Sequence, residues 1–178
     1  MERYDVYNED RELTGKVLDR GQVCEKGENR LVVHICIFNS KNEMLIQKRV
    51  KSKKVAPGRW DLSVGGCSMS GEKTKQTAHR EMLEEIGLDY DFTHHRPHLT
   101  INFEHGFDDY YFIEKDMDLT TLVLQREEVD EVRWASLDEI LELLRNNQFV
   151  SYMETFIISL FELRKQYGVI YDYSLKEA

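Results

Sequence analysis

Glutamates cluster in one short stretch of the sequence, GCSMSGEKTKQTAHREMLEEIGL, which begins at Gly66. The stretch contains Glu72, followed by Glu81, Glu84 and Glu85. In an α-helix the last three side chains project from one arc about 100° wide. The neighbouring arc is predicted to pack against the rest of the protein and holds Ala78, Met82, Leu83 and Ile86. One face of this helix should therefore pack while the other presents carboxylates.

The carboxylate arc indicates a divalent cation. Like charges three or four residues apart on a helix repel each other by a few tenths of a kcal/mol per pair, unless a cation intervenes. Mg²⁺ prefers oxygen ligands, keeps several waters and commonly joins carboxylates to substrate phosphates. We therefore expect a Mg²⁺ site, with Mn²⁺ as the alternative metal, and a diphosphate as the ligand. A Glu-rich run with interspersed Lys is on its own more often a solvated helix face, so the surrounding residues must decide.

The residues around the glutamates follow a specific pattern. It reads G-x₅-E-x₇-R-E-U-x-E-E-x-G-U, where U is aliphatic, and this chain agrees at every specified position. Chance agreement in a chain of this length is on the order of one in 10⁷ at average residue frequencies. Residues 66–88 thus resemble the Nudix box, and the chain is similar to the Nudix superfamily, whose members hydrolyse nucleoside diphosphates linked to another moiety.

The resemblance implies roles for the residues of the box. Glu81, Glu84 and Glu85 would bind the metal, and the backbone carbonyl of Gly65 or Gly66 would join them. Structural roles are implied for Gly66, Glu72, Arg80 and Gly87, with Arg80 pairing with Glu72 to brace the loop.

The implied reaction is attack on one phosphorus of the diphosphate by a metal-activated water. In this superfamily the general base lies in the box or in a later loop. Glu128, six residues before Trp134, stands where some members place an additional carboxylate. A plain surface role for Glu128 within the acidic run REEVDE is an equally good interpretation.

A second resemblance lies upstream, in the segment QKRVKSKKVAPGRWDLSVGG. From Leu31 to Leu88 the chain looks like isopentenyl diphosphate isomerase, a Nudix relative in which basic residues matching Arg49 and Lys53 hold the diphosphate. Where the isomerase has its catalytic cysteine this chain has Gly65, and where its metal-binding histidine follows this chain has Cys67. We therefore favour hydrolysis. An isomerase-like enzyme and a nucleotide-binding sensor without turnover are the alternatives.

Other reactive side chains favour structural roles. Cys67 is interpreted as a packing residue and not as a displaced nucleophile. His34 lies in an apolar strand, where a core role is favoured, and no histidine is predicted to bind metal. An aromatic cluster could contact a base or an isoprenoid-like tail, although strand aromatics usually pack in the core. It consists of Phe107, Tyr110, Tyr111 and Phe112.

The remaining elements must position this box. A hairpin is predicted from Leu31–Phe38 and Met44–Arg49, then one strand in RWDLSVGG and a helix from about Lys73 to Ile86. Further strands are predicted at His98–Phe103, Asp109–Glu114 and Glu131–Ala135, and helices at Leu137–Arg145 and Tyr152–Tyr167. We expect a single Nudix domain over residues 1–178. The resemblance implies an α/β (α+β) fold, an α/β/α sandwich with a central mixed sheet, and the order of strand, loop and helix agrees with it.

Bulk properties exclude several functional classes. The formal charge of −9 disfavours a nucleic-acid polymer, which leaves a small-molecule diphosphate as the expected partner. The start of the chain, MERYDVYNEDREL, lacks the apolar stretch of a signal peptide, so the chain is expected to be cytoplasmic, with no role in a membrane. The apolar residues of the last helix fit either a sheet cover or a dimer contact, so monomer and homodimer are both open. Sugar nucleotides, ADP-ribose, dinucleotides and oxidised nucleotides are all open as substrates.

Overall fold

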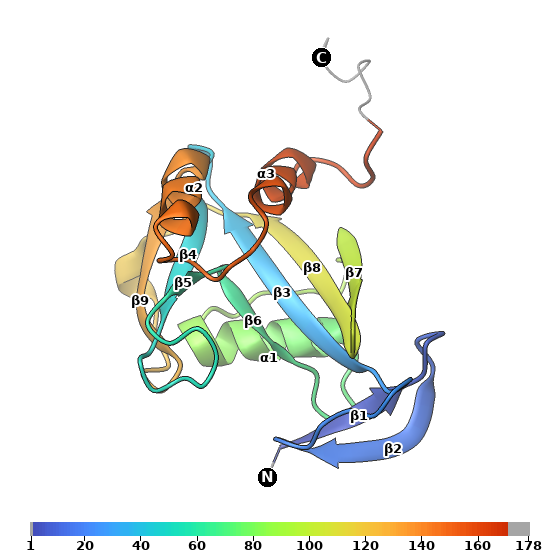
Figure 1. Ribbon diagram of the computed structural model, residues 1–178. Coiled ribbons are helices and arrows are strands. Elements are labelled where there is room, and N and C mark those ends of the chain that lie inside the picture. The colour runs from blue at the N-terminus through green and yellow to red at the C-terminus, as the bar shows by residue number, and fades with distance from the viewer. Residues whose placement is uncertain (1, 171–178) are drawn as a thin grey trace.

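The computed structural model describes residues 2–170 and is built around a mixed β-sheet (Figure 1). The strands of this sheet are β3 (Arg30–Phe38), β4 (Met44–Arg49), β5 (Trp60–Asp61), β6 (Val64–Cys67), β7 (Leu99–Phe103), β8 (Gly106–Glu114) and β9 (Val129–Ala135). The helices are α1 (Thr74–Ile86), α2 (Leu137–Arg145) and α3 (Glu154–Leu163), with a short 3₁₀ turn at Leu119–Thr121. A separate two-stranded sheet is formed by β1 (Arg3–Tyr7) and β2 (Leu13–Asp19).

The strand order of the main sheet is β5-β4-β3-β8-β7, with β6 paired to β3 and β9 paired to β4. Only the pairing of β3 with β8 is parallel among these strands. Strand β3 therefore lies at the centre, with β6 on one side and β8 on the other. Its residue His34 stands opposite Gly65 of β6 and Tyr110 of β8.

The two faces of the sheet are covered by different helices. Along β3, Val33, Ile35 and Ile37 belong to the apolar cluster that includes the buried side chains of α1. The alternate residues Cys36 and Phe38 belong to the cluster that α2 and α3 complete. Figure 1 shows α1 on one side of the sheet and the two later helices on the other. The predicted α/β/α sandwich is confirmed, and α3 serves as a cover of the sheet.

The segment RWDLSVGG is two strands, so the prediction of a single strand was wrong. Strand β5 pairs with β4, whereas β6 pairs with β3. Ser63 lies at the crossing, where its hydroxyl accepts from the N–H of Ile37 and donates to the carbonyl of Leu45. The chain thus moves from one partner strand to the next and delivers Gly65 and Gly66 to the centre of the sheet.

Most predicted elements are confirmed with shifted ends, because strands and helices fray at their termini. The strand predicted from Asp109 begins at Gly106, and the last helix is shorter than Tyr152–Tyr167 at both ends. The sheet of β1 and β2 was not predicted at all. The single-domain boundaries 1–178 stay a prediction. Among residues 2–170, no helix is long and apolar enough to cross a membrane.

Candidate active site

Helix α1 carries the candidate metal ligands, and both of its ends are specified locally. At the start, the side chain of Gln76 accepts a hydrogen bond from the backbone N–H of Lys73. At the end, Gly87 adopts the left-handed conformation at φ 69°, and its N–H donates to the carbonyl of Leu83. A Cβ on Gly87 would also lie 2.8 Å from the Cβ of Val123. Glycine is therefore required there by both conformation and space.

The buried face of α1 differs from the predicted one in two positions. Leu83, which was placed on the packing arc, is 46% exposed, whereas Glu85 is only 6% exposed. Ala78, Met82 and Ile86 are buried as predicted. The helix therefore turns a carboxylate inward where its periodicity predicted an aliphatic side chain.

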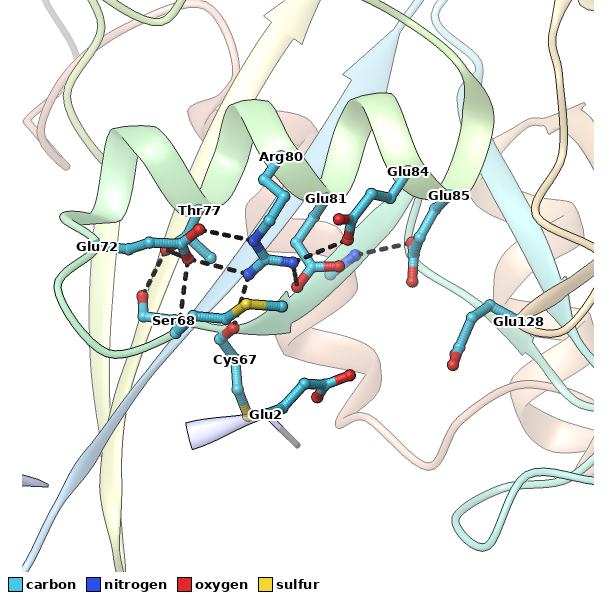
Figure 2. Close-up of polar contacts among 12 residues, drawn as sticks. Glu2, Cys67, Ser68, Glu72, Thr77, Arg80, Glu81, Glu84, Glu85 and Glu128 are labelled. Carbon is cyan, nitrogen blue, oxygen red and sulfur yellow. Dashed lines mark hydrogen bonds and ion pairs between the residues drawn. The ribbon is translucent and has the colours of Figure 1, made fainter. Parts of the chain in front are cut away.

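Arg80 organises the loop that precedes the helix (Figure 2). Its Nε and Nη2 donate to the two carboxylate oxygens of Glu72, at 2.7 and 3.0 Å, and Nη2 also donates to the carbonyl of Cys67 at 3.0 Å. Glu72 in turn accepts from the N–H of Met69 and the hydroxyl of Thr77. These contacts agree with the bracing role that the resemblance implied for both residues.

The same guanidinium reaches two of the candidate metal ligands. Nη1 of Arg80 donates to Glu81 at 2.8 Å and to Glu84 at 3.0 Å. Burial raises the pKa of Glu81, and the charge of Arg80 opposes this rise. Glu84 is the most accessible of the glutamates on this arc, since its side chain is 47% exposed.

Glu85 is a buried carboxylate with neutral hydrogen-bond donors. The side-chain amide of Gln47 donates to it at 3.0 Å and the N–H of Gly65 at 3.3 Å. Burial raises the pKa of Glu85 to about 8, and the negative charge of Glu81 adds to the rise. Nothing in these contacts supplies a full positive charge, so an ionised Glu85 favours binding of a cation beside it.

Gly66 makes room for Glu81. A Cβ on Gly66 would lie 2.1 Å from Oε1 of Glu81, which is far inside van der Waals contact. Any side chain at this position would displace the carboxylate. The glycine of the predicted box is therefore explained by its contact with a candidate ligand.

The donor set of this site fits a hard divalent cation. Glu81, Glu84 and Glu85 offer only carboxylate oxygens, and the burial of Glu85 makes its negative charge costly without a cation. Within residues 2–170, however, no three His, Cys, Asp or Glu side chains stand close enough together to hold a metal. The metal ligands stay a prediction.

Comparison with known proteins identifies the family. The NUDIX domain family matches residues 28–155, which is most of the chain. The chain belongs to the Nudix family. An uncharacterised Nudix hydrolase of Listeria innocua is 46% identical over 164 residues, covering 92% of this chain and 96% of the relative. The assignment to the Nudix hydrolases makes this protein a hydrolase of pyrophosphate bonds.

Two further proteins are similar to this chain. An isopentenyl-diphosphate Delta-isomerase of Pectobacterium atrosepticum is 28% identical over 149 residues, covering 78% of this chain and 80% of the relative. A crystal structure from Deinococcus radiodurans superimposes with a TM-score of 0.75 at 23% identity, covering 89% of this chain and 98% of that chain. The distant isomerase agrees with the second resemblance, and the solved structure supports the fold.

Arg49 and Lys53, which were predicted to hold the diphosphate, have partners of their own. Arg49 donates to Asp61 at 3.0 Å and to the carbonyl of Val55 at 3.1 Å. Lys53 forms an ion pair with Glu128. Burial lowers the pKa of Lys53, as does the charge of Arg49, while the charges of Glu85 and Glu81 oppose the fall. The two cations are therefore near each other and near the glutamates of α1.

Glu128 belongs to the same region, although it comes from a turn before β9. Figure 2 shows it on the side of α1 from which Glu81 and Glu85 project. The side chain of Glu128 is 24% exposed and is held by Lys53. The structure thus brings Glu128 to the box, and its role as a base stays a prediction.

A pocket of about 100 Å³ opens beside these residues. It is lined by Val32, His34, Gln47, Arg49, Asp61, Leu62, Val64, Gly65, Gly66 and Cys67. Sequence reasoning missed Gln47, Asp61 and His34 as pocket residues. A signal existed for Gln47, because a polar residue in the apolar strand MLIQKR must find a buried partner. The core role predicted for His34 was wrong, since its side chain is 19% exposed at the pocket wall.

The aromatic cluster and Cys67 have structural environments. Phe107, Tyr110, Tyr111 and Phe112 are all at most 6% exposed, so they form core and not a ligand platform. Burial raises the pKa of the Cys67 thiol, which disfavours the nucleophilic thiolate. Cys67 is thus a poor nucleophile, as predicted from its position in the loop.

Proposed function

We propose that this protein is a Mg²⁺-dependent pyrophosphohydrolase that cleaves the diphosphate linkage of a nucleoside diphosphate derivative. The observation that carries the proposal is Glu85, a buried carboxylate that lies beside Glu81 on a braced helix and has a raised pKa. A carboxylate in such a place favours a cation, and the neighbouring pocket contains Arg49 for an anionic ligand. The proposed ligands are Glu81, Glu84, Glu85 and the carbonyl of Gly65.

When bound, Mg²⁺ would withdraw charge from the phosphate oxygens and lower the pKa of a bound water. The protein's own groups do the rest. Arg80 and Glu72 hold the loop between β6 and α1, and Arg80 also contacts the carboxylates of Glu81 and Glu84. Arg49 and Lys53 supply positive charge for the diphosphate, and Arg49 is kept in place by Asp61.

Glu128 is the proposed proton acceptor for the attacking water. In the structure it is neutralised by Lys53. A diphosphate competes for the same ammonium group, because its two phosphates together carry more negative charge than the single carboxylate. Binding of substrate would therefore draw Lys53 away and leave Glu128 free to accept a proton.

The geometry at Gly65 favours hydrolysis over isomerisation. Carbon acid–base chemistry needs a catalytic group where the isomerase has its cysteine, but this chain has none there. A Cβ on Gly65 would meet Nδ1 of His34 at 3.0 Å and the carbonyl of Val33 at 3.1 Å. Position 65 thus has no reactive group, and the imidazole of His34 lies where a side chain at this position would begin.

The deciding experiment is hydrolysis of a substrate panel in H₂¹⁸O with Mg²⁺. The panel contains a sugar nucleotide, ADP-ribose, a dinucleotide, an oxidised nucleotide and isopentenyl diphosphate. Products are separated by chromatography, and ³¹P NMR shows which phosphorus carries ¹⁸O. We expect Glu85→Gln and Glu84→Gln to lower kcat by about 10² or more for any compound that is cleaved. The matched control is Glu142→Gln, an exposed glutamate on α2, which should keep full activity.

Other outcomes separate the alternatives. Release of dimethylallyl diphosphate from isopentenyl diphosphate would show an isomerase. Metal-dependent binding of a nucleotide with no product would show a sensor. Unchanged turnover in both glutamine variants would overturn the proposed site.

A further inference from the structure

His34, which lines the pocket, forms a polar pair with Asp108, which lies beside the lining residue Val32, and the proposed chemistry does not use this pair. Nε2 of His34 lies 3.4 Å from Oδ1 of Asp108, and the two side chains are 19% and 21% exposed. His34 comes from the central strand β3 and Asp108 from β8 beside it. Neither side chain forms a hydrogen bond with another group in residues 2–170, so both have capacity for a ligand.

The orientation of His34 is fixed by its surroundings. Its ring stacks on Tyr110 with centroids 4.8 Å apart, and Tyr110 in turn contacts Phe156 of α3 edge-on. Helix α3 thus covers this face of the sheet up to Tyr110, and the covered area ends next to His34. Nδ1 faces Gly65, because a Cβ there would lie 3.0 Å from it. One ring nitrogen therefore faces Asp108 and the other faces the glycine strand of the pocket.

The pair lies next to the place proposed for the diphosphate. Gly65 stands opposite His34 across the strands, and its N–H donates to Glu85. Gln47, which also lines the pocket, donates a hydrogen bond to the same carboxylate of Glu85. A group attached directly to a diphosphate at Glu85 and Arg49 would therefore be the group that meets His34.

The chemistry of the wall selects among such groups. A hydrocarbon tail would remove water from His34 and Asp108 and return no hydrogen bonds, which is unfavourable. A hydroxylated sugar supplies donors for the carboxylate and donors or acceptors for the imidazole. A water needs about 10–15 Å³ of such space, so the pocket of about 100 Å³ holds a group of pentose size.

We infer that His34 and Asp108 form a subsite for the hydroxyl groups of the sugar that is joined to the diphosphate. Two sources offer this chemistry, namely the ribose of the nucleoside and a second sugar on the far phosphate. The inference rests on the proposed function, and it adds the prediction that prenyl diphosphates are rejected at this wall.

The test is equilibrium binding of three non-hydrolysable probes in Mg²⁺ by calorimetry. The probes are α,β-methylene-ADP, its 2′,3′-dideoxy form and α,β-methylene-ADP-ribose. In the unmodified protein we expect the hydroxyls of one sugar to strengthen binding by about tenfold or more, since hydrogen bonds to charged groups are at the strong end. Asp108→Ala and His34→Ala should reduce this advantage to less than about threefold, while the dideoxy form binds both variants as before.

The pattern across the probes locates the sugar. Loss of affinity on removing the 2′ and 3′ hydroxyls, abolished by Asp108→Ala, supports the ribose of the nucleoside. Tighter binding of α,β-methylene-ADP-ribose than of α,β-methylene-ADP, if Asp108→Ala abolishes the difference, supports the second sugar as the occupant of the subsite. Asp108→Leu keeps a side chain of similar size without hydrogen-bonding atoms and should give the same pattern if the alanine variant unfolds. Asp130→Ala, on the exposed part of β9, is the matched control.

Two results would overturn the inference. One is equal weakening of all three probes by the His34 and Asp108 substitutions, and the other is no binding of any probe by the unmodified protein. Hydroxyl-dependent binding without hydrolysis of any panel compound would leave the subsite standing while the proposed hydrolysis fails. Hydrolysis of a panel compound together with binding that does not depend on the hydroxyls would support the proposed hydrolysis and overturn the subsite.

Discussion

Gly66 and Glu81 are so close that a methyl group on Gly66 would lie 2.1 Å from Oε1 of Glu81. Gly66→Ala must therefore move the carboxylate, and we expect kcat to fall by about 10-fold or more because the proposed metal loses a ligand. The measurement is steady-state hydrolysis with a Mg²⁺ titration, in which the metal concentration for half activity should rise. A variant with unchanged metal dependence would contradict this reading.

The control for that change is Glu81→Ala, alone and combined with Gly66→Ala. If displacement of Glu81 is the cause, Gly66→Ala should cost little further activity once the carboxylate is gone. Additive losses would mean instead that the methyl group disturbs the loop backbone.

Arg80→Gln should destabilise the fold. The guanidinium satisfies Glu72 with two hydrogen bonds and also the carbonyl of Cys67, and its loss leaves these acceptors partly buried without a donor. We expect a loss of about 2 kcal/mol in the free energy of unfolding, or about 4–8 °C in Tm. Arg145→Gln breaks a comparable but exposed pair with Glu154 and should leave Tm nearly unchanged. Equal Tm values for the two variants would refute the bracing role of Arg80.

Glu85 should make the metal-free protein less stable as pH rises. Its folded pKa of about 8 lies above the ordinary value of 4.5, so the folded state holds a proton that the unfolded state releases. The associated stability is complete below about pH 4.5 and is lost as pH rises through about 8. In a chelator, we expect Tm to fall by about 5 °C or more between about pH 6.5 and 8.5.

Glu85→Gln should flatten this dependence, because the amide does not titrate. His98, whose pKa burial lowers from 6.5 to about 4, changes the stability chiefly between about pH 4 and 6.5, which is below the chosen range. Added Mg²⁺ at the upper pH should restore Tm in the unmodified protein more than in the variant. A slope that persists in Glu85→Gln would assign the effect to another group.

The ion pair between Lys53 and Glu128 allows binding and catalysis to be separated. If Glu128 accepts the proton of the attacking water, Glu128→Gln should lower kcat by about 10² and remove the acidic limb of the pH–rate profile. Lys53→Met should chiefly raise KM. A Glu128→Gln variant with unchanged kcat and a lower KM would show that Glu128 only holds Lys53. Glu127→Gln is the neighbouring control, since it changes the same charge in the same turn.

The strands, the helices and the box could be predicted because their signals are local, whereas the layers were implied by the resemblance to the Nudix superfamily. The hydrophobic run of β3 and the spacing of Gly66, Glu72, Arg80 and Gly87 can be read without tertiary contacts. The burial of Glu85 could not be read in this way. It depends on Gln47 and Gly65, which lie on two other strands. Leu83 was wrongly predicted to be buried, because helical periodicity shows the apolar face of a helix but not which residues at its borders contact the sheet.

The pocket wall was harder to predict than the box. His34 looks like a core residue in LVVHICIF, and its exposure follows only from where α3 ends its cover near Tyr110. The strands β1 and β2 were missed because β2 is mostly exposed and lacks the alternation that marks a half-buried strand. Distant contacts thus explain the error at His34, and the lack of an alternating pattern explains the missed strands.

The small sheet of β1 and β2 has a practical consequence for anyone who trims this protein. The carboxylate of Asp5 accepts from the hydroxyl of Ser70 and the N–H of Gly71, and Arg3 accepts from the N–H of Ser70. The family match begins only at residue 28. A protein truncated to that boundary would lack the hydrogen bonds that Arg3 and Asp5 make to the loop before α1. Low activity of such a truncated protein would then result from the truncation and not from a poor active site.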